Sequence, residues 1–219
     1  MRLKDLFLPL NKIIKVLVLS DFIITSAFGF VAPIFALFIT DKIQGGTIET
    51  VGFAAAFYWL AAVLTRLPVA RYIERTKSEK DDFYFMILGS ILICVIPFLY
   101  LLSTKIWHIY LVEAFYGIGY SLRLPGWYGM FTRHIDKGHE GYEWSFYSLI
   151  AGTGSAITAA LGGLMAAKFG FNVLFIFVGA ISILGSVILI FLYYIVEPNH
   201  HNKDVYLEEK SLTINGKNE

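Results

Sequence analysis

The chain has 219 residues, a formal net charge of +1, and only 16% charged side chains against 57% hydrophobic ones. A soluble domain usually carries about 25% charged residues, and a nearly neutral chain without a basic surface stretch does not have the composition of a nucleic-acid-binding protein. The mean hydropathy of +0.64 is typical of an integral membrane protein. The composition therefore excludes a soluble fold and a nucleic-acid partner, and it predicts a lipid bilayer as the surroundings.

Six apolar segments are long enough to cross a bilayer, which takes roughly 20 residues of helix. In chain order they cover residues 16–40, 48–71, 83–103, 106–132, 143–167 and 171–196. None shows the alternation of a membrane β-strand. We therefore expect an all-α membrane protein with a six-helix transmembrane domain at residues 16–196. A cytoplasmic N-terminus at 1–15 precedes it, and a polar, disordered cytoplasmic tail at 197–219 follows it.

The orientation follows from the Lys and Arg residues near the ends of the segments. Most of them lie in the N-terminus, in the loops around 72–82 and 133–142, and in the tail, whereas the opposite loops hold only Lys42, Lys105 and Lys168. Both termini are therefore expected on the cytoplasmic side. The first apolar segment exceeds the 7–15 residues of a signal peptide. We expect it to be retained, in a prokaryotic inner (plasma) membrane.

The first three segments and the last three have the same spacing. A shift of 92 positions places Asp21 on Glu113 and Pro33 on Pro125. Because three crossings are an odd number, the second set enters the membrane from the opposite side. The spacing therefore predicts an inverted 3+3 repeat, in which the first helix of each unit carries an acid ahead of a proline.

Asp21, Glu113 and Arg123 lie well inside the segments, where an ionisable residue costs about 2.5–3.5 kcal/mol or more at the helix centre. Glu113 and Arg123 cannot pair within one helix, because ten residues separate them by ~15 Å along its axis, so Arg123 is expected to reach Asp21. In one interpretation Asp21 and Glu113 carry protons or cations and Arg123 is an anion or counter-charge site. In the other, the charges form a structural ion pair. Arg66, near the end of its segment, is expected to extend its charged group to the membrane surface.

Prolines, glycines and aromatic residues interrupt the apolar pattern. Pro33 and Pro125-Gly126 are expected to bend or break their helices beside a cavity. Trp127 and Tyr128 either line a solute cavity or pack against lipid and other helices. Small residues allow close helix packing, and the candidates for this role are Gly117, Gly119, Gly126, Gly154, Gly162 and Gly163.

Catalytic and metal-binding patterns are missing from the sequence. The histidines of the loops and tail have no spaced set of Cys, His or carboxylate companions that would hold a metal. There is also no phosphate-binding or dinucleotide-binding glycine motif. We therefore expect no enzymatic activity, no metal and no cofactor.

Three motifs in order resemble those of the major facilitator superfamily. "ARYIERTKSEK" from Ala70 to Lys80 matches the family's signature between its second and third helices, with Arg71, Glu74 and Arg75 in that stretch. "IYLVEAFYGIG" is similar to the fourth-helix motif, with Gly117 and Gly119 in register and Glu113 at the place of the family's arginine. Gly154, Gly162 and Gly163 match the fifth-helix signature. The chain resembles one six-helix half of such a transporter over residues 15–196.

The resemblance implies a function that the composition alone does not give. Family members are secondary transporters with two six-helix halves, and the motif of Arg71, Glu74 and Arg75 serves as a conformational gate. It implies transport of a small-molecule solute by alternating access, with a proton as the candidate coupling ion. One half cannot enclose a central cavity, so a homodimer or a second six-helix half is implied. The alternative is a membrane interaction or assembly subunit that transports nothing.

Overall fold

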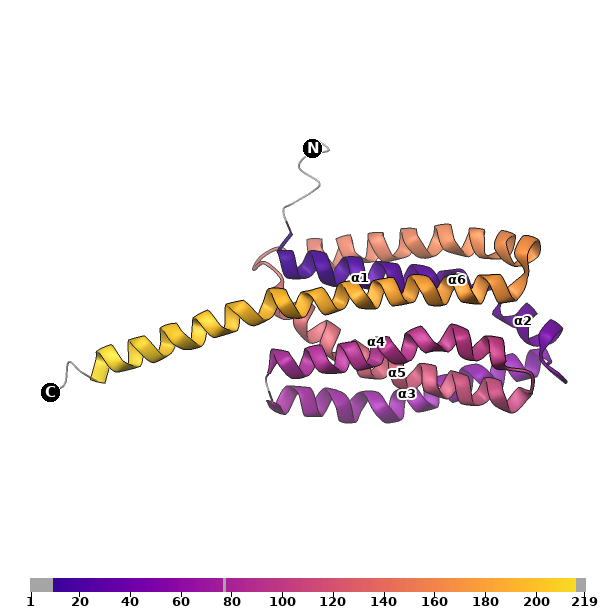
Figure 1. Ribbon diagram of the computed structural model, residues 1–219, viewed down its shortest axis with the longest axis horizontal. Coiled ribbons are helices and arrows are strands. Elements are labelled where there is room, and N and C mark those ends of the chain that lie inside the picture. Colours follow the sequence, from indigo (N-terminus) through magenta and orange to yellow (C-terminus); the bar gives the residue numbers. More distant parts are fainter. Residues whose placement is uncertain (1–9, 77, 216–219) are drawn as a thin grey trace, which may run out of the picture.

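The computed structural model describes residues 10–76 and 78–215, with side chains as far as Phe191. Within this part the chain is helical, with no strand beyond an isolated bridge between Gln44 and Lys105, which confirms the all-α expectation. The elements, shown in Figure 1, are α1 (Lys12–Gly29), the 3₁₀ turn η2 (Ala32–Ile34), α2 (Phe35–Lys42), α3 (Ile48–Thr76), α4 (Glu79–Leu102), α5 (Ile106–His134) and α6 (Glu140–Asn215). Within the expected tail at 197–219 the backbone is helical as far as Asn215, which differs from the expected disorder. The cytoplasmic placement of the N-terminus at 1–15 and of the tail stays a prediction.

The first apolar segment is interrupted where its proline stands. Proline has no backbone N–H and cannot donate the bond that continues an α-helix. Here α1 ends at Gly29, Pro33 lies in the 3₁₀ turn η2, and α2 then continues to Lys42. The backbone N–H of Ile34 donates to the carbonyl of Val31 at 3.0 Å, as 3₁₀ geometry requires. The segment is therefore a broken helix.

Helix α6 turns back on itself at Gly170. This residue has φ 79° and ψ 170°, a conformation outside the helical range that side chains disfavour. We call residues 140–169 the first arm of α6 and residues 171–215 its second arm. Figure 1 shows the two arms running back along each other from this turn.

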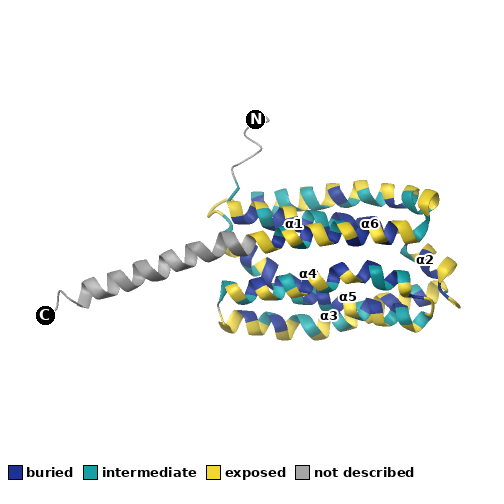
Figure 2. Ribbon diagram, in the orientation of Figure 1, coloured by how far each residue is buried: buried dark blue, intermediate teal, exposed yellow. Residues whose placement is uncertain are grey.

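The helices form two layers. One contains α1 and both arms of α6, and the other contains α3, α4 and α5 (Figure 1). Contacts between α4 and α6 join the layers, and there the Sγ of Cys94 lies 3.0 Å from the Oγ of Ser186. Figure 2 shows buried residues facing inward and exposed residues facing outward on these helices.

Two apolar clusters fill the inside of the bundle. The cluster at the α2 end includes Phe38, Tyr100 and Phe175. The other, which includes Met86 and Trp127, lies at the opposite end, where α1 and α4 begin and α5 ends. Between them the bundle contains the polar residues described below.

By length and composition alone, four segments of the described chain can cross a membrane. They are Lys12–Lys42, Ile48–Thr76, Glu79–Leu102 and Glu140–Phe191. The number is four rather than the six expected crossings for two reasons. The stretch in α6 is counted once because its helix passes through the bend at Gly170, and α5 is not included because Glu113, Arg123 and its tyrosines lower its hydropathy.

The expected break at Pro125-Gly126 is not present, which corrects the prediction. Helix α5 is continuous from Ile106 to His134, with Pro125 inside it. A proline removes one backbone hydrogen bond from a helix, and membrane helices tolerate such a residue inside protein. Helix α5 also packs closely on α4 at this point, where a Cβ added at Gly126 would collide with the carbonyl oxygen of Asp82.

The predicted packing glycines lie at close approaches between helices, with one exception. A Cβ at Gly117 would collide with the carbonyl of Tyr58 on α3, and one at Gly119 would lie 3.0 Å from the Cβ of Leu92 on α4. In the first arm, Gly154 and Gly162 similarly face Ser26 and Phe30 on α1. At Gly163 an added Cβ would meet nothing within 4 Å, so packing does not require glycine there.

Replacing Gly162 by alanine is expected to lower thermal stability, because the added methyl group would press on the backbone of α1. Such overpacking costs roughly 1–3 kcal/mol, whereas alanine is favoured over glycine inside a helix by at most ~1 kcal/mol. Gly163→Ala is the matched control, and it should leave the melting temperature unchanged or slightly higher. The loss of the monodisperse peak on heating, followed by size-exclusion chromatography in detergent, measures both variants. Equal losses would contradict the assigned packing.

Candidate functional site

A cavity of about 580 Å³ lies between the two layers, toward the α2 end. Helices α1, α3 and α5 and the first arm of α6 supply most of its lining, and α4 supplies Tyr100. We call it the first cavity. Its lining is rich in aromatic side chains: Phe28, Phe35, Tyr58, Tyr100, Tyr116 and Tyr120. A volume of this size is within the usual range for small-molecule sites, roughly 300–1,000 Å³.

Glu113 is the charged residue of this cavity. Its side chain is buried, and the hydroxyl of Tyr100 donates a hydrogen bond to its Oε1. Within the described part of the chain no ion pair reaches Glu113. A carboxylate in apolar surroundings without a counter-charge is strongly destabilised, so it takes up a proton or binds a cation.

The expected contact between Arg123 and Asp21 is present. The Nη2 of Arg123 lies 2.7 Å from the Oδ1 of Asp21, and the hydroxyl of Tyr147 donates to the Oδ2 at 2.8 Å. Arg123 is 1% exposed and Asp21 3% exposed, and neither lines the first cavity. These contacts join α1 and α5 with the first arm of α6, as the interpretation of a structural ion pair requires.

Trp127 and Tyr128 take different positions. Trp127 is 1% exposed and stacks on Phe131, with ring centroids 4.9 Å apart, while its indole N–H donates to the carbonyl of Leu17 at 3.4 Å. It is thus a core residue. Tyr128 is half-exposed and lines a second cavity of about 770 Å³ between α3 and α5.

Arg66 lies between the two cavities. It lines the second cavity, and its guanidinium carbon is 5.7 Å from the ring centroid of Tyr120, which lines the first. Its Nε and Nη2 are buried without a hydrogen-bond partner in the described structure. These nitrogens do not reach a surface, so the expectation that Arg66 extends its charged group outward is wrong for them, and the tyrosine ring is their aromatic partner.

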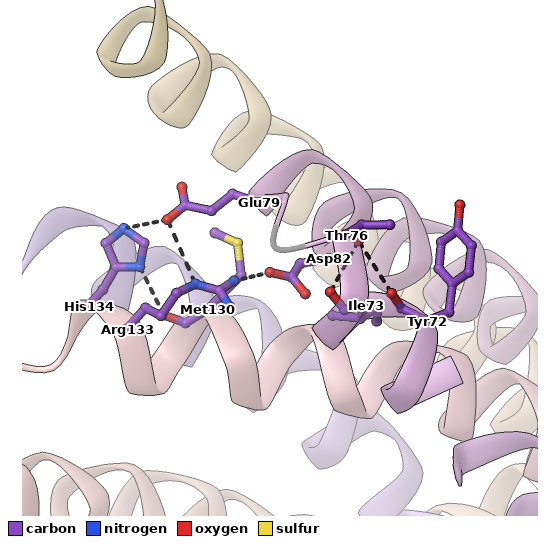
Figure 3. Close-up of polar contacts among 8 residues, drawn as sticks. All are labelled: Tyr72, Ile73, Thr76, Glu79, Asp82, Met130, Arg133 and His134. Carbon is purple, nitrogen blue, oxygen red and sulfur yellow. Dashed lines mark hydrogen bonds and ion pairs between the residues drawn. The ribbon is translucent and has the colours of Figure 1, made fainter. Parts of the chain in front are cut away.

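The residues of the predicted gate motif, Arg71, Glu74 and Arg75, are all exposed. The ion pairs at this end of the bundle are made by other residues, drawn in Figure 3. Arg133 pairs with Asp82 and lies 3.8 Å from the carboxylate of Glu79, to which His134 is also 3.8 Å away.

Sequence reasoning missed this second charged group, although the sequence contained a signal for it. Acidic residues in the first turn of a helix and basic residues in the last turn complement the helix dipole. Glu79 and Asp82 occupy the first turn of α4, and Arg133 and His134 the last turn of α5. Antiparallel packing of the two helices brings these turns together. In the described residues, no three His, Cys, Asp or Glu side chains are grouped so as to hold a metal ion.

Comparison with known proteins decides the family. A sequence profile of the Major Facilitator Superfamily matches residues 17–215. The chain belongs to this superfamily. It is therefore an integral membrane protein of a transporter family, as the sequence motifs indicated, and nothing in this kinship points to an enzyme.

The similar proteins are bacterial transporters. The chain is 30% identical over 151 residues to the proton-coupled antiporter flippase LtaA of Staphylococcus haemolyticus, covering 68% of this chain and 37% of that protein. It is 26% identical over 171 residues to a multi-drug resistance efflux pump PmrA homolog of Lactococcus lactis, covering 78% and 41%. The matched region is therefore less than half the length of either relative.

The fold has a solved counterpart. The crystal structure of the POT family transporter PepTSo superposes with a TM-score of 0.67 at 14% sequence identity. The superposition covers 83% of this chain and 37% of that one. The likeness concerns the arrangement of the helices.

Removing either partner of the pair between Asp21 and Arg123 is expected to destabilise the protein more than removing both. A single change leaves one buried charge without compensation, at a cost of about 3–5 kcal/mol. Asp21→Asn, Arg123→Met and the double variant form a double-mutant cycle, measured by unfolding in mixed micelles. The double variant should be no less stable than either single one. Losses that simply add would contradict an ion pair.

Proposed function

We propose that this chain forms one six-helix half of a secondary transporter, which moves a small solute by alternating access together with a second six-helix half. The observation that carries the proposal is the position of Glu113, a buried carboxylate without a counter-charge in the lining of the first cavity. An ionisable group inside a membrane normally marks a transport or proton pathway. Membership of a transporter superfamily supports the same function.

Six crossings and an inverted repeat are part of this proposal. Each arm of α6 is long enough for a bilayer crossing, and α5, with its buried charges, packs on α3 and α4. Helix α1 packs on both arms of α6, just as α5 packs on α3 and α4. This is the pattern expected when the first helix of each repeat packs on the second and third helices of the other.

A contact between α4 and α6 supports the same symmetry. Cys94 and Ser186, which touch, are 92 positions apart, the spacing that relates Asp21 to Glu113. On a two-fold axis equivalent residues meet each other, so this contact is where the axis of the repeat would pass. Ser90 and Ser182, four positions before Cys94 and Ser186, are also 92 positions apart, and both are fully buried.

The second half is proposed as another copy of this chain. The first cavity is lined by α1, α3, α5 and the first arm of α6, and large apolar residues of α3 and the first arm are exposed. A two-fold axis along the membrane normal would place the same faces of a second copy opposite them and close the cavity. Such an axis keeps both copies in one orientation, with all termini in the cytoplasm of a bacterial cell, as the Lys and Arg distribution predicts.

The proposed coupling ion is a proton carried by Glu113. The LtaA relative is a proton-coupled antiporter flippase. In this chain Asp21 is held by Arg123, whereas Glu113 is free to change its protonation state as the cavity opens and closes. Arg71, Glu74 and Arg75 are proposed to form a conformational gate. These exposed side chains would contact the second half of the transporter.

Glu113→Gln is expected to abolish solute accumulation driven by a pH gradient, because an amide cannot release a proton. The measurement is uptake into proteoliposomes with an imposed pH gradient and a panel of amino acids, sugars and organic cations. Glu49→Gln, a change of an exposed acid in the first turn of α3, is the matched control and should retain uptake. Unchanged accumulation by Glu113→Gln would remove the carboxylate from the coupling mechanism.

Native mass spectrometry from lipid nanodiscs is expected to give the mass of two chains. A two-fold partner is proposed because large apolar residues of α3 and the first arm of α6, two of the elements that line the first cavity, are exposed. Transport by a preparation that remains monomeric would contradict the second half. A monomer that accumulates no solute at all would instead support a membrane assembly subunit.

A further inference from the structure

We propose that the first cavity binds an organic cation with aromatic or bulky apolar groups. This inference rests on the proposed transport function and names the class of its solute. It is argued from the charge of the cavity, from its aromatic lining and from a missing partner in the repeat.

The lining of the first cavity carries a negative charge and no positive one among the described residues. Of the described residues around the first cavity, Glu113 is the one charged side chain. Arg123, ten positions along α5, is already bound to Asp21. A cationic ligand would supply the missing counter-charge, whereas an anion would meet an uncompensated carboxylate in a medium of low dielectric constant.

The aromatic lining suits a cation with apolar substituents. Tyr116 stacks on Phe28 with ring centroids 4.9 Å apart and lies 5.1 Å from Tyr58, so the rings form a continuous wall that includes Tyr120 at 6.3 Å from Tyr58. Ring faces attract cations, and they do so more strongly when the pair is desolvated. The guanidinium of Arg66 over Tyr120 is a cation already held in this way.

The repeat shows where a protein cation is missing. Under the shift of 92 positions Asp21 corresponds to Glu113, and Arg123 corresponds to Val31. The pair between Asp21 and Arg123 therefore has the counterpart Glu113 and Val31, in which valine replaces the arginine. Val31 lines the same cavity as Glu113. The ligand cation would occupy the space beside Glu113 that an arginine at this position would fill.

The test measures binding of radiolabelled tetraphenylphosphonium to the purified full chain in detergent micelles. We expect saturable binding, and a loss in affinity of about tenfold or more in Glu113→Gln, because a charge-assisted contact is removed. Val31→Lys should cause a similar loss by placing a tethered cation beside Glu113. Val31→Met adds bulk without charge at the same position and should lose less affinity than Val31→Lys. Glu49→Gln, the control for a lost surface charge, should keep affinity within about twofold.

Three results would overturn the cation site. They are unchanged affinity in Glu113→Gln, equal losses in Val31→Lys and Val31→Met, and equally tight binding of tetraphenylborate, an anion of the same shape that is assayed separately. Each variant is compared only if its size-exclusion peak matches that of the wild type. Glu113→Gln conserves side-chain volume and keeps the acceptor for Tyr100, so the test stands even where Val31→Lys does not fold.

The outcomes separate this inference from the proposed function. Binding of tetraphenylphosphonium that depends on Glu113, without any solute counterflow in proteoliposomes, would support the cation site and overturn the transport function. Counterflow of another class of solute, without such binding, would support transport and overturn the cation site.

Discussion

A charge buried in apolar surroundings must be compensated, and the buried pair of Asp21 and Arg123 determines how the rest of the bundle meets this requirement. The pair crosses between the layers, since Asp21 belongs to α1 and Arg123 to α5. Tyr147 extends it to the first arm of α6. Because these three elements meet at a fixed polar contact, the apolar clusters on either side pack around a defined register.

The same requirement separates the two ends of the bundle. At the end where α4 begins and α5 ends, Asp82, Glu79, Arg133 and His134 compensate one another (Figure 3). All four residues belong to α4 and α5, which are adjacent helices of one layer. A rigid-body movement of that layer would therefore move the whole group without breaking its ion pairs. Toward the α2 end Glu113 has only a tyrosine hydroxyl. A site whose charge must be supplied from outside is where binding can change the balance between conformations.

The sequence predicted those features that depend on periodicity and on pairwise reach. Ten residues of helix separate Glu113 from Arg123, too far for a direct bond within α5. Asp21 was therefore the expected partner of Arg123. The break at Pro125-Gly126 was wrongly expected, because a proline removes one backbone hydrogen bond from a helix and membrane helices tolerate such a residue inside protein. The buried position of Trp127 and the position of Arg66 between the two cavities also depend on how each helix is rotated about its axis. The type of residue alone does not determine this rotation.

The proposed symmetry of the repeat makes its one asymmetry informative. Two equivalent acids in equivalent surroundings would need two cations. The chain provides Arg123 for Asp21, but the equivalent position for Glu113 is the uncharged Val31. The compensated acid then serves the fold, because moving it would expose a buried arginine. The uncompensated acid is destabilised in its charged form until a proton or a ligand arrives. Under the proposed function, a single difference between arginine and valine divides two related carboxylates into a structural one and one available for transport.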